Sequence, residues 1–323
     1  MRAVFLTGGT GFVGGAVLRY LSRNASLRLI AGVRKHSSHI PESVTQVVGE
    51  QNSLCFTASD LSDIDVVIHA AARVHIMNEE GDDALAAFRK VNTDVTLALA
   101  REAAHAGVRR FVFISSIKVN GEGTLLGSPY RADDPPAPMD AYGISKLEAE
   151  QGLLALASET GMEVVIIRPV LVYGPGVKAN FRTMMNWLYK GLPLPFGSVT
   201  NKRSLVALDN LVDLIVTCID HPAAANQVFL VSDGEDLSTT SLLLRMGQAL
   251  GKPTRLLPVP IGLLTVLATT LGKKAVSQRL LGSLQVDIEK TRQLLSWAPV
   301  TSVNKALAQT AEDFLRRSGK ASD

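Results

Sequence analysis

Short runs of apolar residues alternate along the first half of the chain with longer segments in which apolar residues recur every three or four positions. The short runs are "AVFLT", "LRLIAGV", "TQVV", "DVVIHAA", "RFVFIS" and "EVVIIRP". Several are apolar at nearly every position, which is typical of strands covered on both faces. Helical patterns lie between them, notably over about 82–105 and 140–158. This order predicts an α/β fold with a doubly wound, parallel Rossmann sheet.

The regular alternation ends near Pro169, beyond which prolines and short mixed elements are frequent. We expect a dinucleotide-binding domain over 1–168 and a smaller, discontinuous substrate-binding region over 169–323, with some elements returning to the first domain. The most apolar stretch, "PIGLLTVLATTLG" (260–272), is shorter than the roughly 20 residues of a membrane span. We interpret it as a core helix, with a membrane-surface or partner-docking helix as the alternative.

Composition narrows the class of protein. The 323 residues are 46% hydrophobic and 20% charged, which suffices for a large core. The net charge of +3, without a lysine or arginine block, gives no reason to expect nucleic-acid binding. Cys55 and Cys218 show neither metal-ligand spacing nor a disulfide pattern, and the first residues begin a strand instead of a signal peptide. We expect a cytoplasmic protein without a metal site.

A glycine-rich turn joins the first strand to a helix in "VFLTGGTGFVGGAVLRYL". Gly8 permits the tight turn, Gly11 lets the backbone approach a pyrophosphate, and Gly14 lets helix and strand pack closely. The diphosphate is expected at the helix N-terminus, at Phe12 and Val13, where free N–H groups favour anions. A structural turn without a ligand is the alternative.

The end of the second strand bears on the choice of cofactor. An acid there would bind the adenosine ribose, whereas an arginine accommodates a 2′-phosphate. The chain reads "LIAGVRKHS", so Arg34 and Lys35 occupy this place. A guanidinium binds phosphate bidentately and lysine adds a point charge. The prediction is NADP(H), with NAD(H) as the alternative if both charges are merely solvated.

"AYGISKLEAE" places Tyr142 and Lys146 on one face of a helix. A free tyrosine has a pKa of about 10, and a nearby ammonium or a cationic nicotinamide ring lowers it. The phenol can then exchange a proton with a carbonyl or alcohol oxygen while hydride moves. An isolated pattern of this kind usually marks a solvated helix face, but here it follows a dinucleotide loop and the strand "FVFISS".

With these motifs the chain resembles the extended short-chain dehydrogenase/reductases, in the sugar-nucleotide epimerase/dehydratase group. The resemblance covers nearly the whole chain and includes "TGGTGFVG", "VVIHAAA", "ISS", "YGISK", "RPVLVYGPG", "RSLVALDNLVD" and Asn92. It implies that Tyr142 is the acid/base, that Lys146 binds the nicotinamide ribose, and that Ser116 hydrogen-bonds the reacting oxygen. The resemblance also places Ala70, Ala71 and Ala72, the last residues of "VVIHAAA", beside the cofactor.

The resemblance also implies nucleotide-sugar contacts at Asn180, Phe196 and Arg203. Arg203 suits a diphosphate through forked hydrogen bonds, and "PLPFG" offers an apolar wall for a pyrimidine base. Arg279 is a second candidate for the diphosphate. The alternatives are ordinary surface arginines and a core phenylalanine. Family members often form homodimers through two long helices of each subunit, so a UDP-sugar and a second copy are the expected partners.

The residues after the catalytic hydroxyl restrict the reaction. Family members that dehydrate sugar nucleotides carry an Asp-Glu pair there, whereas this chain has Ile117 and Lys118. A dehydratase is therefore not expected. Lys118 is interpreted as an exposed loop lysine, with a contact to substrate or cofactor phosphate as the alternative.

The remaining choice lies between a reductase and an epimerase. An epimerase keeps NAD bound, whereas a reductase consumes reduced cofactor, which in cells favours NADPH; Arg34 and Lys35 therefore favour a reductase. "SSIKVNGE" and the stretch around "PLPFG" are most similar to bacterial O-antigen and capsule reductases that make UDP-N-acetylquinovosamine from a UDP-4-keto-6-deoxy-N-acetylhexosamine. We expect this activity. The alternatives are a UDP-glucose or UDP-GlcNAc 4-epimerase, a reductase of a non-nucleotide ketone, and a non-catalytic NADP-binding sensor.

Overall fold

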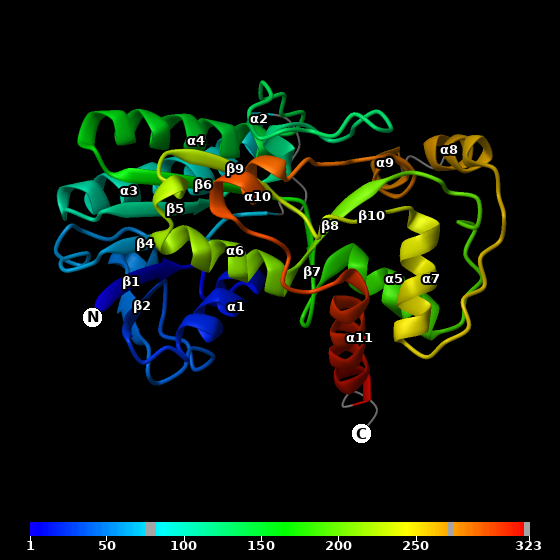
Figure 1. Cartoon of the computed structure of the whole chain (residues 1–323), viewed down its shortest axis with the longest axis horizontal. Coiled ribbons are helices and arrows are strands. Elements are labelled where there is room, and N and C mark those ends of the chain that lie inside the picture. The colour runs from blue at the N-terminus through cyan, green and yellow to red at the C-terminus, as the bar shows by residue number, and fades with distance from the viewer. Residues whose placement is uncertain (75–81, 271–273, 320–323) are drawn as a thin grey trace.

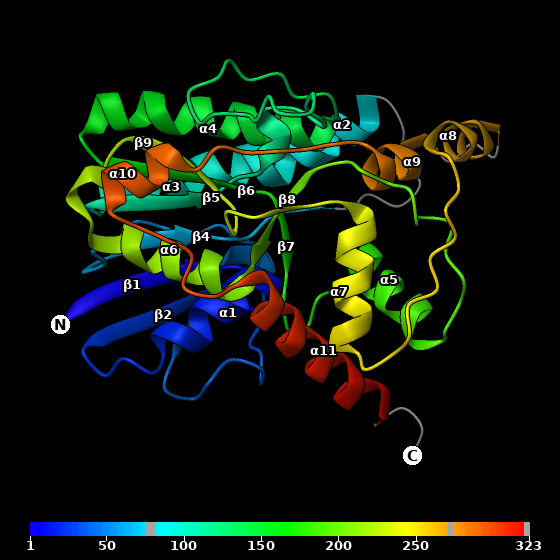
Figure 2. The same cartoon turned by 45° about the vertical axis from the view of Figure 1, so that its right-hand side comes forward.

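The computed structural model describes residues 1–74, 82–270 and 274–319. A parallel sheet with the strand order β3-β2-β1-β4-β5-β6-β9 lies between two layers of helices (Figures 1 and 2). The strands are β1 (Arg2–Thr7), β2 (Leu27–Val33), β3 (Thr45–Val48), β4 (Val66–His69), β5 (Arg110–Ile114), β6 (Glu163–Pro169) and β9 (Gln227–Val231). The strand order reverses at β1, which is the point where ligands bind in such sheets. The predicted doubly wound Rossmann fold is confirmed.

Both faces of the sheet are buried, as the apolar runs predict. On one face, Val4 and Leu6 pack in one cluster with residues of α1 (Phe12–Leu21) and α6 (Leu208–Asp220). On the other, Phe5 packs in a second cluster with α3 (Val95–His105) and α4 (Ala141–Thr160). Neighbouring residues of a strand point to opposite faces, so one apolar run serves both layers. Short 3₁₀ turns connect several elements: Glu50–Asn52, Ile117–Val119 and Pro222–Ala224.

The helix expected over about 82–105 is present but is not regular. It consists of α2 (Asp82–Arg89), a π-helical segment (Lys90–Asp94) and α3. Asn92 lies fully buried in the π segment. Its Oδ1 accepts from the backbone N–H of Arg73 (2.8 Å), and its Nδ2 donates to Ser145 Oγ (3.1 Å). The irregular turn thus joins the loop after β4 to the helix that carries Tyr142.

Residues beyond Pro169 build a second core and also return to the first sheet. β7 (Leu171–Tyr173), β8 (Arg203–Ala207) and β10 (Asp236–Leu237) form a small sheet. It shares a core with α5 (Ala179–Tyr189), α7 (Thr239–Ala249) and α11 (Val303–Gly319), while β9 pairs with β6 in the large sheet. The remaining helices are α8 (Ile261–Thr270), α9 (Lys274–Leu281) and α10 (Glu289–Leu295).

The interpretation of 260–272 as a core helix is wrong for residues 260–270, and the rest of this segment lies outside the described residues. α8 contains no buried residue and lies at the outer end of the molecule, far from the large sheet (Figures 1 and 2). Apolar residues all around a helix normally indicate burial, but α8 packs beside α9 at an edge where most of its surface stays open. In the described part of the chain, no helix is both long enough and apolar enough to cross a membrane.

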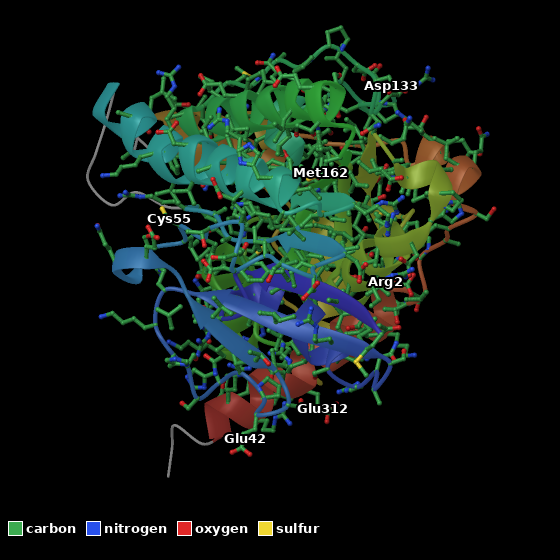
Figure 3. The ribbon with its side chains drawn as sticks, turned by 90° about the vertical axis from the view of Figure 1, so that its left-hand side faces the viewer. Arg2, Glu42, Cys55, Asp133, Met162 and Glu312 are labelled. Carbon is green, nitrogen blue, oxygen red and sulfur yellow. The ribbon has the colours of Figure 1, made fainter. Side chains whose placement is uncertain are left out.

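Both cysteines are free. Cys55 lies at the surface (Figure 3), whereas Cys218 is buried in α6. Among the described residues, no group of three or more histidines, cysteines and carboxylates could hold a metal ion.

Candidate active site

The glycine loop is built by close packing against the neighbouring strand. Gly8 has a φ of 78°, and a Cβ there would lie 2.6 Å from the backbone nitrogen of Ala71. A Cβ on Gly14 would overlap the carbonyl oxygen of Gly8, whereas Gly11 is exposed and less crowded. α1 begins at Phe12, and within the described chain no side chain caps its N-terminus. Its first N–H groups can therefore bind an anion such as a diphosphate.

The other predicted cofactor residues lie around this loop. Ala70, Ala71 and Ala72 directly follow β4, and the first two contact Gly8. Arg34 and Lys35 directly follow β2, and both are exposed. Because β1, β2 and β4 are parallel neighbours, all these residues lie at the carboxyl edge of the sheet. That edge is where a dinucleotide binds in folds of this kind.

Ser116 and Tyr142 meet at the same edge. Ser116 follows β5 and begins the 3₁₀ turn Ile117–Val119, while Tyr142 lies in the first turn of α4. Burial raises the pKa of Tyr142 to about 12, the Asp140 charge adds to this rise, and a hydrogen bond with Ser116 opposes it. The sequence predicts an acidic tyrosine, but in the structure loss of hydration outweighs the hydrogen bond.

Lys146 lies one turn further along α4 and is fully buried. Its Nζ donates to the carbonyl oxygen of Ile114 (2.7 Å) and lies 3.9 Å from the centre of the Phe113 ring. Burial lowers the pKa of Lys146 to about 7, although the Glu150 carboxylate acts in the opposite direction. Burial thus makes the charged form of Lys146 less favourable than in water, whereas a nearby negative charge favours it.

Lys118 lies in the 3₁₀ turn that follows Ser116. Its Nζ forms ion pairs with Asp140 and with Glu122 (3.1 Å). Asp140 also caps α4, because its Oδ1 accepts from the N–H of Gly143 (2.7 Å). The side chain of Lys118 is 28% exposed, so Lys118 is not the fully exposed loop lysine expected from the sequence. Its ion pair with Asp140 ties the loop after Ser116 to the start of the Tyr142 helix.

A buried ionic network supports the site from behind. Arg168 donates to both carboxylate oxygens of Glu150 (2.6 and 3.0 Å) and to Asn120 Oδ1 (3.0 Å), and the Ser115 hydroxyl donates to Glu150. All four side chains are almost completely buried. The sequence analysis missed Glu150, although it lies four and eight residues after Lys146 and Tyr142 and therefore shares their helix face.

The structure brings together two of the predicted substrate residues. Arg203 begins β8, and its Nη1 donates to the carbonyl oxygen of Gly282 (3.1 Å). Burial lowers the pKa of Arg203, and the positive charge of nearby Arg279 lowers it further. Two guanidinium groups that repel each other form a favourable place for a dianionic group such as a diphosphate.

The two other predicted substrate residues lie on neighbouring segments. Asn180 is exposed in the first turn of α5. Phe196 is half-buried in the loop after α5, where its carbonyl oxygen accepts from Thr240 Oγ1 (2.5 Å). Among the described residues, no hydrogen bond or ion pair between side chains joins Asn180 or Phe196 to Arg203 or Arg279.

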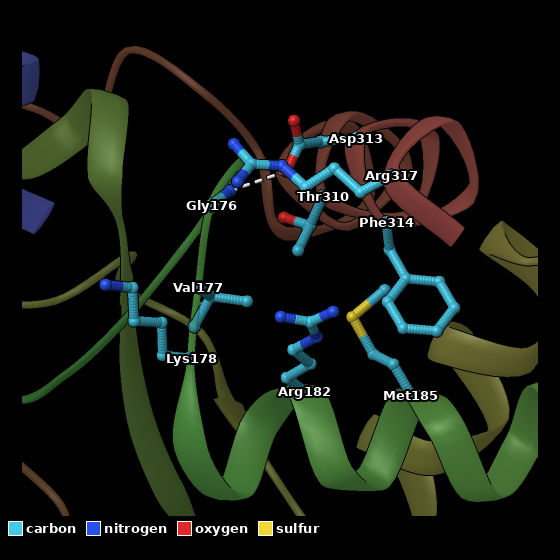
Figure 4. A pocket seen from close by; sticks show the side chains of 9 residues that line it. All are labelled: Gly176, Val177, Lys178, Arg182, Met185, Thr310, Asp313, Phe314 and Arg317. Atoms are coloured by element: carbon cyan, nitrogen blue, oxygen red, sulfur yellow. Dashed lines mark hydrogen bonds and ion pairs between the residues drawn. The ribbon is translucent and has the colours of Figure 1, made fainter. Parts of the chain in front are cut away.

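A small cavity of about 40 Å³ lies between α5 and α11 (Figure 4). At its edge Asp313 accepts from the N–H of Gly176 (2.7 Å) and pairs with Arg317 (2.8 Å). Arg182 and Met185 of α5 line the opposite side (Figure 4). Ligand sites are usually about 300–1,000 Å³, so this cavity is too small for a sugar nucleotide.

The sequence and the structure of this chain are both similar to those of known proteins. The model of the NAD dependent epimerase/dehydratase family matches residues 4–232. The UDP-glucose 4-epimerase of Vibrio cholerae is 49% identical over 320 residues, which cover 99% of this chain and 97% of that protein. The N-acetyl-alpha-D-glucosaminyl-diphospho-ditrans,octacis-undecaprenol 4-epimerase of Escherichia coli O157:H7 is 28% identical over 316 residues, or 92% of this chain and 91% of that protein.

Among solved structures, a UDP-glucuronic acid 4-epimerase from Bacillus cereus in complex with NAD has a TM-score of 0.78 at 20% identity, covering 98% of this chain and 99% of that one. This likeness supports the fold. The family model spans the glycine loop, Ser116, Tyr142 and Lys146, and the similarity to the Vibrio protein extends over nearly the whole chain. This protein therefore belongs to the NAD dependent epimerase/dehydratase family.

Proposed function

We propose that this protein is a 4-epimerase of a UDP-hexose that keeps its nicotinamide dinucleotide bound between turnovers. The main support is the 49% identity, over 99% of this chain, to a protein named UDP-glucose 4-epimerase. The reductase that the sequence analysis favours becomes the second candidate. Its specific support is the exposed pair Arg34 and Lys35 at the end of β2, which suits the 2′-phosphate of NADP(H).

The residues around the glycine loop fit a dinucleotide. The N-terminus of α1 offers N–H groups for the diphosphate, and the exposed Gly11 leaves the backbone accessible there. Lys146 is assigned to the nicotinamide ribose. The dinucleotide supplies a hydride acceptor and donor and, when oxidised, a positive charge. For an epimerase we assign NAD as this cofactor, in keeping with the NAD in the solved relative.

Tyr142 and Ser116 handle the proton in this proposal. Tyr142 removes the proton of the sugar C4 hydroxyl, and it returns this proton after the 4-keto sugar has rotated to present its other face. Ser116 holds the same oxygen by a hydrogen bond. In the structure burial keeps the pKa of Tyr142 at about 12. Positive charge beside the phenol lowers that pKa, so Tyr142 becomes an effective base when Lys146 is charged and the cofactor is oxidised.

Substrate binding is assigned to the other half of the site. Arg203 and Arg279 hold the diphosphate, Phe196 packs against the uracil, and Asn180 contacts the nucleotide sugar. We also propose a homodimer in which α3 and α4 of each subunit pair with the same helices of the other. The two helices already lie side by side, since a Cβ on Gly152 of α4 would contact Leu97 of α3 at 2.6 Å.

The test is incubation of the purified protein with UDP-glucose, and separately with UDP-GlcNAc, without added cofactor. We expect the C4 epimer of at least one substrate to accumulate to equilibrium, and NAD to be released when the protein is denatured. Absence of both epimers, together with NADPH oxidation in the presence of a UDP-4-keto-6-deoxy-N-acetylhexosamine, would support the reductase instead. Released NADP would assign Arg34 and Lys35 to its 2′-phosphate.

Replacing Arg203 by alanine is expected to raise the KM for the UDP-hexose about 10–100-fold, because a hydrogen bond to a charged group contributes roughly 1.5–3 kcal/mol. Bound dinucleotide should not change. Steady-state kinetics and the nucleotide content of the purified variant measure the two effects. Arg182→Ala, on α5 and outside the Arg203–Arg279 pair, is the control and should behave like the wild type. An unchanged KM in Arg203→Ala would remove the diphosphate assignment.

A further inference from the structure

α8 exposes an apolar surface that the fold leaves uncovered. Leu263, Val266 and Leu267 are all half or more exposed, and so is Leu257 in the segment that leads into the helix. The three α8 residues lie at i, i+3 and i+4 and therefore share one face. Isolated apolar residues are common on protein surfaces, but a contiguous apolar patch indicates an interaction site.

The threonines of α8 make the helix still less polar. The hydroxyl of Thr265 donates to the carbonyl oxygen of Ile261 (3.0 Å), Thr269 to Thr265 (2.8 Å), and Thr270 to Leu267 (2.9 Å). Each hydroxyl thus donates its hydrogen within its own helix. A helix in a soluble interface can leave one polar face to solvent, whereas α8 has apolar groups or internally bonded hydroxyls on every side.

The segment of the chain that contains α8 carries positive but no negative side chains. Residues 237–286 contain no aspartate or glutamate, although they include six basic residues: Arg245, Lys252, Arg255, Lys273, Lys274 and Arg279. Lys252 and Arg255 lie just before α8, and both are exposed. Clustered basic residues beside an apolar helix are attracted to the negative surface of anionic lipids. This charge complementarity favours a lipid surface over a second copy of this chain.

We propose that α8 binds the surface of an anionic phospholipid bilayer. Leu263, Val266 and Leu267 enter the boundary between headgroups and acyl chains, and Lys252 and Arg255 contact lipid phosphates. A helix of ten residues is about 15 Å long, half of the roughly 30 Å hydrocarbon core, so it lies on the bilayer and does not cross it.

The bilayer contact would adjoin the proposed substrate region. The N–H of Leu257 donates to the carbonyl oxygen of Leu194 (2.8 Å), and the N–H of Gly197 donates to that of Leu257 (2.9 Å). The segment leading into α8 is therefore hydrogen-bonded to the loop that contains Phe196, while α9, beside α8, carries Arg279. Lipid binding itself does not depend on which reaction the site performs.

The experiment is flotation of the full-length protein with vesicles of phosphatidylcholine alone or of phosphatidylcholine and phosphatidylglycerol. We expect flotation with the anionic vesicles only, and weaker flotation at high salt. Val266→Asp should weaken partitioning at least about tenfold, because it places a charge in the apolar contact. Val300→Asp is the matched control, since Val266 and Val300 are 59% and 58% exposed. It should float like the wild type.

Three results would overturn the proposal. The first is a wild-type protein that stays unbound with both vesicle types, or floats equally with both. The second is an equal loss of flotation in Val266→Asp and Val300→Asp. The third is a fall in molar mass of Val266→Asp in light scattering without lipid, which would make α8 an interface between copies of the chain. Thermal unfolding of both variants verifies that each is folded, and epimerase activity is not needed for any readout.

Discussion

Replacement of Tyr142 by phenylalanine is expected to lower kcat about 10²–10⁴-fold, the usual contribution of a positioned acid/base. The change removes only the hydroxyl that is bonded to Ser116. The ring and its edge contact with Phe88, at 5.8 Å between centres, can remain. We therefore expect a folded protein that retains its dinucleotide but no longer exchanges the proton of the sugar hydroxyl.

The measurement combines kcat for UDP-glucose with the nucleotide content of the purified variant. Tyr189→Phe is a suitable control, because it removes the hydroxyl of a tyrosine on α5, outside the Ser116–Tyr142–Lys146 set. The control should keep wild-type activity and the same amount of bound dinucleotide. Near-normal turnover in Tyr142→Phe would contradict the acid/base role, whereas loss of the dinucleotide would indicate a structural role instead.

Glu150→Gln is expected to reduce the free energy of unfolding by about 3–5 kcal/mol, as is usual when one partner of a buried ion pair is removed. The substitution keeps the shape of the side chain but leaves the Arg168 guanidinium without its countercharge. Both residues are at most 4% exposed, so water cannot replace the lost partner. The amide also provides only one oxygen for the donors of Arg168 and Ser115.

Chemical denaturation measures this effect, and α4 itself offers the control. Glu148, two residues earlier on the same helix, forms an equally close pair with Arg89 at 2.6 Å, but the side chain of that arginine is 48% exposed. Glu148→Gln should therefore cost less than about 1 kcal/mol. In addition, the double variant Glu150→Gln with Arg168→Met should be more stable than Glu150→Gln alone. Equal losses at positions 148 and 150 would contradict the importance of burial.

Features encoded by neighbouring residues could be predicted from the sequence. The strands, the glycine turn and the helix carrying Tyr142 and Lys146 each depend on a local repeat or spacing. The partners that these residues find across the fold could not be predicted in this way. Lys118 and Asp140 are 22 residues apart, and Glu150 and Arg168 are 18 residues apart.

Two predictions failed or were weakened for physical reasons. The apolar content of α8 predicts burial, but α8 contains no buried residue, because composition alone does not say whether the fold brings other elements over a helix. The reductase prediction depended on the similarity of short stretches such as "SSIKVNGE" to known reductases, and on Arg34 and Lys35. The role expected for these two residues, binding a cofactor 2′-phosphate, does not determine the fate of the hydride. The roles proposed for Ser116, Tyr142 and Lys146 are the same in either reaction, so these three residues alone do not separate an epimerase from a reductase.

The π-helical segment at Lys90–Asp94 determines how α2 is rotated about its axis relative to α3. One residue more than a regular turn contains is accommodated there, and each residue turns an α-helix by about 100°. Without the additional residue, α2 would be rotated by that angle relative to α3. Phe88 would then turn away from Tyr142, and Arg89 away from Glu148. A single-residue deletion in this segment would thus misdirect a whole helix while leaving every side chain on it unchanged.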